Sequence, residues 1–140
     1  MSGRDPDRFR SEVTAIAVAV VRHRQHVLVG VRSPDAVLPG MAEFPGGKLQ
    51  RDESAAAAAV RECLEETGIH VAVERLLDEV THEYPHGRLR LAFFDCRLIE
   101  SDAELPAPHL PFRWLPQAEL ATLSFPAANQ RLLRWLEEND

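Results

Sequence analysis

Three glutamates with helical spacing are the residues of this sequence that could most directly do chemistry. Glu62, Glu65 and Glu66 lie in "RECLEETG" (61–68), just before a glycine that would end a helix. Like charges at i,i+3 and i,i+4 destabilise a helix by about a few tenths of a kcal/mol per pair, and the negative end of the helix dipole adds a similar penalty. A divalent cation would remove both penalties, and carboxylates on one helical face suit Mg²⁺. The glutamates therefore predict a metal site, with a solvated acidic helix face as the alternative.

The segment before these glutamates adds groups that could bind a phosphate. Gly46-Gly47 permits a tight turn whose carbonyls could face a cation or whose amides could face a phosphate. Lys48 could supply a positive charge to a phosphate, and Glu53 adds a fourth carboxylate. A glycine pair alone more often indicates an ordinary turn. Together with the glutamates, these residues predict a combined metal and phosphate site.

A helix over residues 54–67 must position the glutamates. Alanine has the highest helix propensity, Asp52 or Ser54 could cap the start, and Gly68 suits the left-handed position after the end. At about 100° per residue, the glutamates share one side of this helix with Ala55 and Ala58. We therefore expect a narrow acidic face, opposite an apolar face that packs inward. The inward face would carry Ala56, Val60, Leu64 and Thr67, with Cys63 on the flank.

The remaining apolar segments predict a mixed sheet. Residues 13–21 are almost continuously apolar, as in a strand buried on both faces, and residues 25–32 alternate as a strand does. Strands separated by two substantial helices predict an α/β fold, with a mixed sheet covered by helices on its faces. The other expected elements are a loop at 33–41, strands in part of 71–83, over 88–98 and at 112–115, a helical turn at 116–120 and a closing helix at 126–137.

Length, charge and cysteine content limit the class of protein. The 140 residues fit a polar tail at 1–11 and one domain at 12–140. The tail lacks the apolar core of a signal peptide, and no apolar stretch is long enough to span a membrane as a helix. A net charge of -6 argues against direct nucleic-acid binding. Cys63 and Cys96 match no CxxC pattern, so we expect reduced thiols in a cytoplasmic protein.

The stretch from Gly47 to Ile69 resembles the Nudix box, G-x5-E-x7-R-E-U-x-E-E-x-G-U, where U is a bulky aliphatic residue. Every fixed position is matched, and the one departure is Cys63 at an aliphatic position. "EFPGGK", "HEYPHGRLRLAFFDC" and "FRWLPQAEL…FPAANQRLL" are similar to further landmarks of MutT-type members, so the likeness covers roughly residues 12–137. The resemblance implies an α/β/α sandwich around a mixed sheet. It also implies hydrolysis of a nucleoside diphosphate linked to another group, with Mg²⁺ or Mn²⁺ as cofactor.

The resemblance also implies roles for residues of the box. Glu65 and Glu66 match metal ligands, and Glu62 matches either a ligand or the general base. Arg61 matches an arginine that orients a catalytic glutamate through a charge-assisted hydrogen bond. The backbone carbonyl of Gly46 or Gly47 would complete part of the metal shell, and Glu53 would be a further, weaker metal contact.

One carboxylate of the MutT-type pattern has no counterpart at its place. These enzymes have an additional glutamate in a loop before the last strand, and ungapped counting puts Pro108 or His109 there. Glu100, Asp102 or Glu104 could substitute if the loop shifts.

Residues outside the box are the ones that bear on the substrate. Asn129 ends "FPAAN", which resembles the segment whose asparagine contacts the purine in MutT-type enzymes. A carboxamide could donate to O6 and accept from N7–H of 8-oxoguanine at once, a pairing that unmodified guanine cannot offer. The alternative is an asparagine that caps the helix or faces solvent. Arg32 matches a phosphate-binding arginine, whereas Phe44 and Tyr84 could either stack on a base or belong to the core.

These patterns leave three functional hypotheses open. The first is a Mg²⁺-dependent nucleoside triphosphate pyrophosphohydrolase that converts 8-oxo-dGTP to 8-oxo-dGMP and pyrophosphate, which would cleanse the nucleotide pool. The second is hydrolysis of CTP or other (d)NTPs. The third, from a different class, is a module that binds a nucleotide without cleaving it. That module predicts a damaged box, whereas Glu62, Glu65 and Glu66 are all present.

Overall fold

The structure is a computed structural model that describes residues 13–33, 35, 40–85, 87–100 and 104–139. The polar tail expected at 1–11 lies outside the described residues. Among the described helices, none is both long and apolar enough to cross a membrane. The strands are β1 (Val13–His23), β2 (His26–Val31), β3 (Ala42–Glu43), β4 (Gly46–Lys48), β5 (Val71–Tyr84), β6 (Gly87–Leu98) and β7 (Phe112–Pro116). The helices are α2 (Ala55–Thr67) and α3 (Gln130–Glu138), and two 3-10 helices are η1 (Gln117–Thr122) and η2 (Ala127–Asn129).

Strand β1 is the centre of a mixed sheet with the order β3-β2-β1-β6-β5. It runs parallel to β6 and antiparallel to β2 and to the short strand β4, which pairs with β1 at residues 16–18. Strand β7 is antiparallel to β2, and β5 forms an antiparallel hairpin with β6. The five expected strands are therefore confirmed, and the one expected only in part of 71–83 is continuous over β5.

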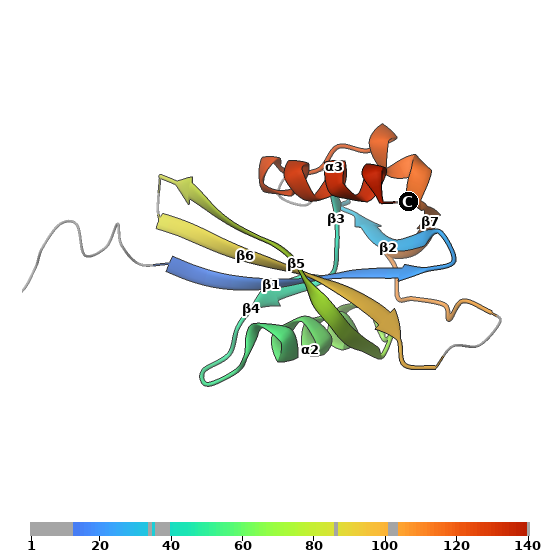
Figure 1. Cartoon of the computed structure of the whole chain (residues 1–140), viewed down its shortest axis with the longest axis horizontal. Helices are drawn as coiled ribbons and strands as arrows, with labels where there is room; N and C mark the ends of the chain where they lie inside the picture. Colours follow the sequence, from blue (N-terminus) through green and yellow to red (C-terminus); the bar gives the residue numbers. More distant parts are fainter. Residues whose placement is uncertain (1–12, 34, 36–39, 86, 101–103, 140) are drawn as a thin grey trace, which may run out of the picture.

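Helices cover both faces of this sheet, α2 on one side and α3 on the other (Figure 1). Side chains of β1 alternate between the two cores: Ala17 and Val21 pack with the α2 side, whereas Val18 and Val20 pack with the α3 side. A central strand buried on both faces explains the almost continuous apolar run in its sequence. The expected α/β/α sandwich is confirmed.

Helix α2 has the predicted length and caps, but its inward face differs in part from the expected one. Ser54 Oγ accepts a hydrogen bond from the Ala57 amide, and Gly68 takes the left-handed conformation (φ 77°) after the last turn. Thr67 and Cys63 are fully buried, and Ala56 and Val60 are partly buried against the same core, as expected for an inward face. The expected position of Ala58 on the acidic side is wrong, because Ala58 is fully buried. The physical reason is space, since the helix lies close to the sheet and small residues allow that approach. The buried residues of the helix are Ala58, Ala59, Cys63 and Thr67.

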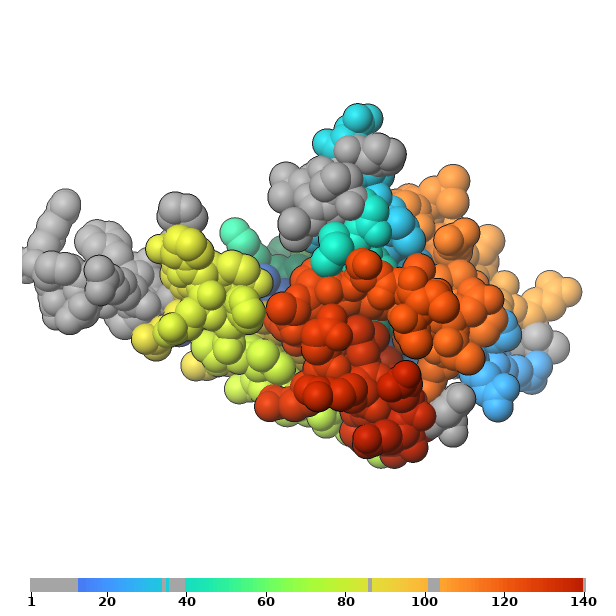
Figure 2. Space-filling model, turned by 90° about the horizontal axis from the view of Figure 1, so that it is seen from above, coloured from blue at the N-terminus to red at the C-terminus, as the bar shows by residue number. Residues whose placement is uncertain are grey.

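The C-terminal segment covers the other face of the sheet (Figure 2, red). The closing helix expected at 126–137 starts later, because residues 127–129 form the 3-10 helix η2 and α3 begins at Gln130. Pro126 has an extended backbone (ψ 153°), and its carbonyl accepts the Asn129 amide at 3.0 Å, which closes a tighter turn. Leu132 and Leu136 anchor α3 to the core, and Gln117 donates to the Leu136 carbonyl at 2.7 Å.

Candidate active site

Two of the three helix glutamates point at strand β4 rather than at open solvent. The Gly46 amide donates to Glu66 Oε1 at 2.8 Å, and the side chain of Glu62 lies against Gly47. This orientation follows from the turn of α2 that buries Ala58 and Cys63, because the same rotation carries Glu62 and Glu66 toward the sheet. Glu65 stays at the edge, with 54% of its side chain exposed.

The two glycines of β4 are required by close contacts, and not by the tight turn that the sequence suggested. Both lie in an extended strand, where Gly46 pairs with Val18 and Gly47 with Ala17. A Cβ on Gly46 would lie 2.5 Å from the Ala17 carbonyl oxygen, and a Cβ on Gly47 would lie 2.5 Å from Glu62 Oε2. The prediction of a turn at this pair is therefore wrong. The pair instead lets β4 approach both β1 and the carboxylates of α2.

Arg61 holds three of the carboxylates. Its Nε and Nη2 donate to the two oxygens of Glu53 at 2.7 and 2.9 Å, and its Nη1 donates to Glu62 Oε1 at 2.8 Å and to Glu65 at 3.1 Å. Nη2 also donates to the Lys48 carbonyl at 3.1 Å, which ties the helix to β4. Bidentate, charge-assisted contacts of this kind are strong and directional. The Arg61 guanidinium therefore offsets part of the repulsion between the carboxylates at the C-terminal end of α2.

The carboxylates differ in how readily they ionise. The hydrogen bonds from Arg61, with a further one from the Gln50 amide, lower the pKa of Glu53 to about 2. Burial raises the pKa of Glu66 to about 7, against the opposing effect of the Gly46 amide. The carboxylates of Glu62, Glu43 and Glu65 contribute to the same increase in the pKa of Glu66. Negative charge is thus concentrated around Glu66.

The donor set fits a hard divalent cation. Glu43, Glu53, Glu62, Glu65 and Glu66 provide five carboxylates, whereas the arginines of the described residues that pair with them are Arg32 and Arg61. Oxygen ligands and an excess of negative charge are what Mg²⁺ requires. The carboxylates are held by different partners, such as the Gly46 amide and Arg61. No three acidic, histidine or cysteine side chains of the described residues already converge as a set of metal ligands.

Glu43 belongs to this cluster although the sequence analysis did not select it. It accepts from Arg32 Nε at 3.1 Å, and its charge raises the pKa of Glu66. The structure therefore joins the predicted phosphate-binding arginine to the edge of the carboxylate cluster. The available signal was the position of Glu43 at the start of "EFPGGK". The exposed side chain of Lys48 lies at the other end of the same short segment.

Asn129 lies on the α3 side of the sheet, where it neither caps the helix nor faces solvent. It is only 8% exposed, and its side chain does not cap α3 but donates to the Pro126 carbonyl at 3.2 Å. Phe125 of the same segment stacks on Phe44, with ring centroids 5.0 Å apart and an angle of 26° between the planes. The Ala42 amide donates to the Ser124 carbonyl at 2.7 Å. The asparagine segment is thus fastened to the strand that leads to Gly46.

The two candidate stacking aromatics have different surroundings. Phe44 is 6% exposed and belongs to the core on the α3 side, where it supports Phe125. Tyr84 is 43% exposed at the end of β5 and packs on the His82 ring at 4.6 Å. Among the described residues, only Tyr84 of this pair presents a face to solvent.

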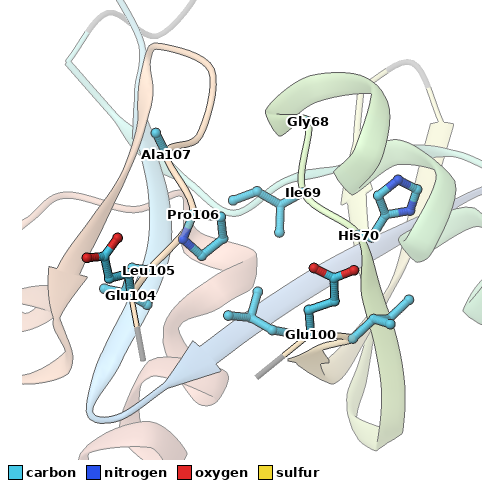
Figure 3. Close-up of a pocket in the computed structure, with 10 residues that line it drawn as sticks. Gly68, Ile69, His70, Glu100, Glu104, Leu105, Pro106 and Ala107 are labelled. Atoms are coloured by element: carbon cyan, nitrogen blue, oxygen red, sulfur yellow. The ribbon is translucent and has the colours of Figure 1, made fainter. Parts of the chain in front are cut away.

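The candidates for the additional glutamate lie near the C-terminus of α2. The His109 ring lies over Gly68, and the His109 amide donates to the Thr67 carbonyl at 2.9 Å. Glu100 and Glu104 line a cavity next to Gly68, and the Glu100 carboxylate stands between Ile69 and His70 (Figure 3). The described lining of this cavity includes none of the glutamates of α2. Asp102 lies outside the described residues.

Comparisons with known proteins agree with this architecture. The model of the NUDIX domain family matches residues 17–135. An 8-oxo-dGTP diphosphatase of Escherichia coli K12 is 30% identical over 125 residues, which cover 87% of this chain and 95% of that protein. An 8-oxo-dGTP diphosphatase of Proteus vulgaris is 39% identical over 80 residues, 56% of this chain and 71% of that protein.

Solved structures show the same fold. The MutT protein of methicillin-resistant Staphylococcus aureus 252, a Nudix hydrolase, is 30% identical with a TM-score of 0.72, over 93% of this chain and 99% of that one. The MutT protein of Methanosarcina mazei has the same TM-score at 23% identity, over 92% and 96% of the two chains, and indicates the fold alone.

Proposed function

The chain belongs to the Nudix hydrolase family, and on that premise we propose that it converts 8-oxo-dGTP to 8-oxo-dGMP and pyrophosphate with Mg²⁺ or Mn²⁺ as cofactor. The proposal includes one hydrolase domain over residues 12–140, a cytoplasmic location and a role in cleansing the nucleotide pool. Both cysteines are buried free thiols, which suits a reducing compartment.

The observation that carries the proposal is the placement of the asparagine segment. Asn129 is buried, does not cap its helix, and is fastened through Phe125 and Phe44 to the segment that ends at Gly46. The residue proposed to contact the base and the carboxylate cluster are therefore linked through one continuous segment, which supports the proposal. Relatives named 8-oxo-dGTP diphosphatases support the same substrate.

The metal ligands in this proposal are the carboxylates of α2. Glu65 and Glu66 would hold the ion, with Glu62 as a ligand or a base and with the carbonyl of Gly46 or Gly47 as a further ligand. When bound, Mg²⁺ would neutralise phosphate oxygens and acidify a coordinated water. Glu53 acts in this structure through Arg61, which it holds by two hydrogen bonds, so we propose a positioning role for it.

Glu62 is the proposed general base. Arg61 fixes one of its oxygens at 2.8 Å, and the other oxygen lies against Gly47, so the carboxylate has a defined direction. Glu62 would take a proton from the attacking water as the water oxygen bonds to the β-phosphorus. The bond from the β-phosphorus to the oxygen that bridges the α- and β-phosphorus then breaks, and the nucleoside monophosphate leaves with that oxygen. The remaining product is pyrophosphate.

Different residues around the segment 42–48 would bind the phosphates and the base of the substrate. Arg32 and Lys48 are the proposed phosphate contacts, Asn129 the base contact and Tyr84 an exposed aromatic surface that a base could stack on. Phe44 would contribute as the support of Phe125. A buried amide that pairs with both O6 and N7–H of 8-oxoguanine leaves a polar group unpaired with guanine, which gives strong discrimination.

The test is a comparison of kcat/KM for 8-oxo-dGTP, dGTP, dCTP, CTP and the other (d)NTPs in the presence of Mg²⁺, with the products identified by chromatography. We expect a preference for 8-oxo-dGTP and the products 8-oxo-dGMP and pyrophosphate. Broad or cytidine-directed cleavage would favour the second hypothesis and exclude the role of Asn129.

A non-catalytic module is tested by the same panel. Glu65→Gln should abolish hydrolysis with the fold intact, whereas Glu137→Gln on the exposed side of α3 should change nothing. A wild-type protein that binds nucleotides but cleaves none of them would support the module.

A further inference from the structure

A second cavity lies at the end of the sheet where β1 turns into β2. This turn is on the right of Figure 1. It has a volume of about 580 Å³, within the range of small-molecule sites. Three segments form its walls: residues 22–24 from the end of β1, residues 74–75 from β5 and residues 95–97 from β6. All of these residues are described, and none of them belongs to the carboxylate cluster.

The charge of this cavity is opposite to that of the protein. Among the described residues, its walls carry four arginines and two carboxylates, Glu74 and Asp95, whereas the whole chain has a net charge of -6. We call this cavity the arginine pocket. Its four arginines are Arg22, Arg24, Arg75 and Arg97.

Three of the guanidinium groups, those of Arg22, Arg75 and Arg97, are held by two carboxylates. Asp95 accepts from Arg22 at 2.8 and 3.0 Å and also pairs with Arg75 at 3.5 Å, so one carboxylate serves two arginines. Arg22 and Arg75 both lie over the Trp135 ring, at 5.2 and 5.6 Å from its centroid. Fixed guanidiniums lose less conformational entropy when they bind a ligand.

The more exposed arginines leave donors on the solvent side. The side chains of Arg75 and Arg97 are 59% and 57% exposed, and Arg97 pairs with Glu74 at 2.7 Å through Nε. A guanidinium has five N–H donors, so these contacts do not use them all.

His23 gives a second, independent indication. The side-chain atom Nε2 of His23 is buried and has no hydrogen-bond partner among the described residues. The His23 residue lines the arginine pocket. A buried polar atom without a partner is destabilising, so one of the residues that line the arginine pocket carries an unmet hydrogen-bonding group.

We propose that the arginine pocket binds a small anion that carries a phosphate group, at a site separate from the catalytic cluster. A phosphate monoester carries about two negative charges at neutral pH, and guanidinium forks suit phosphate oxygens. Arg22, Arg75 and Arg97 outnumber the two carboxylates that hold them, which favours such an anion. Gly46 pairs with Val18, and Arg22 lies four residues further along β1, roughly 13 Å away at about 3.3 Å per residue. The proposal does not depend on which nucleotide the enzyme cleaves.

The test is an NMR titration of the full chain labelled with ¹⁵N, with inorganic phosphate added at constant ionic strength set by NaCl. We expect saturable shifts of the backbone amides of residues 22–24 and 95–97. Because each amide is observed separately, binding at the arginine pocket is distinguished from binding near Arg32 and Lys48. Weak shifts that grow in proportion to phosphate without saturation would overturn the proposal.

Variants of exposed arginines make the titration specific. Arg97→Gln and Arg75→Gln should each weaken phosphate binding about tenfold, as expected for the loss of a charge-assisted hydrogen bond. Arg88→Gln is the matched control, because Arg88 is also a half-exposed arginine of β6 but pairs with Glu83 outside the pocket. Equal binding by Arg97→Gln and Arg88→Gln would overturn the assignment.

Two further ligands identify the source of the phosphate. Tighter binding of ribose 5-phosphate than of inorganic phosphate would indicate a phosphorylated metabolite, and equal binding would indicate the free ion. Saturation of the same amides by a single-stranded oligonucleotide at much lower concentration than by either phosphate would overturn a small-anion site.

Discussion

Alanine substitutions at Gly46 and Gly47 should separate catalysis from stability within one short strand. A Cβ on Gly47 would meet the carboxyl end of Glu62, with Oε2 at 2.5 Å, and that end belongs to a flexible side chain that can move. A Cβ on Gly46 would instead meet backbone atoms of β1, the Ala17 carbonyl oxygen at 2.5 Å and the Val18 Cα at 3.0 Å. Two neighbouring glycines with the same substitution therefore have different consequences.

The size of the effect at Gly47 follows from the contact distance. Ordinary contact begins at 3.4 Å, so Glu62 Oε2 must move by about 0.9 Å from its position at 2.5 Å. A misplacement of about 1 Å in a catalytic group can lower the rate on the order of 100-fold. We therefore expect Gly47→Ala to lower kcat by roughly two orders of magnitude with little change in Tm. Gly46→Ala should cost about 1–3 kcal/mol of unfolding free energy, as overpacking against a rigid backbone does.

The assay combines Mg²⁺-dependent hydrolysis of the best nucleotide in the panel with thermal unfolding followed by circular dichroism. Gly40→Ala serves as a control for the substitution itself, because no atom of the described residues lies within 4 Å of its Cβ position, although its positive φ of 78° adds some strain. A Gly47→Ala enzyme with wild-type kcat would refute the placement of Glu62 against β4. A Gly46→Ala protein as stable as the wild type would refute the close approach of β4 to β1.

Three further predictions concern single side chains. Glu53→Gln should lower kcat about 10- to 100-fold at nearly unchanged KM, because the hydrogen bonds that orient Arg61 are weakened. The control Glu83→Gln, on the exposed hairpin, should leave kcat unchanged. Equal kcat values for the two variants would contradict the positioning role of Glu53. The ion pair with Arg131 lowers the pKa of Asp78, so its stabilisation is present above the unfolded value of about 3.9 and is lost as the pH falls through the lower folded value. The Tm difference between wild type and Asp78→Asn should accordingly shrink between pH 7 and pH 3, and a constant difference would contradict this account. Asn129→Ala should lower the ratio of kcat/KM for 8-oxo-dGTP over dGTP by at least about tenfold, and an unchanged ratio would remove Asn129 from base recognition.

Local sequence signals predicted the elements and the box because both depend on neighbours in the chain. The apolar run of β1 identified a strand buried on both faces, and Ser54 and Gly68 identified the ends of α2. The arrangement of Arg61 with Glu62 also agreed with the expected contact, because the two residues are adjacent in sequence. These features need no knowledge of which strands pair.

Features that depend on distant partners were not predictable in the same way. The helical spacing placed Ala58 on the acidic side of α2, but the close approach of helix and sheet buries the small residues Ala58 and Ala59 completely and leaves Val60 only partly buried against the core. The strand conformation of Gly46-Gly47 depends on pairing with β1, nearly 30 residues earlier. The arginine pocket likewise requires three strands whose order the sequence does not state.

The segment from Ala42 to Gly46 explains why base recognition and hydrolysis should be coupled in this fold. Ala42 is bonded to Ser124 and Phe44 is stacked on Phe125, so the base side is fastened to this segment. Gly46 is bonded to Glu66, so the carboxylate side is fastened to its other end. Five residues of extended chain span at most about 18 Å, so the backbone limits the distance between the Asn129 segment and the carboxylates of α2. Under the proposed function, a base that fails to seat against Asn129 would therefore displace the phosphates from the carboxylates, and selectivity would appear in kcat as well as in KM.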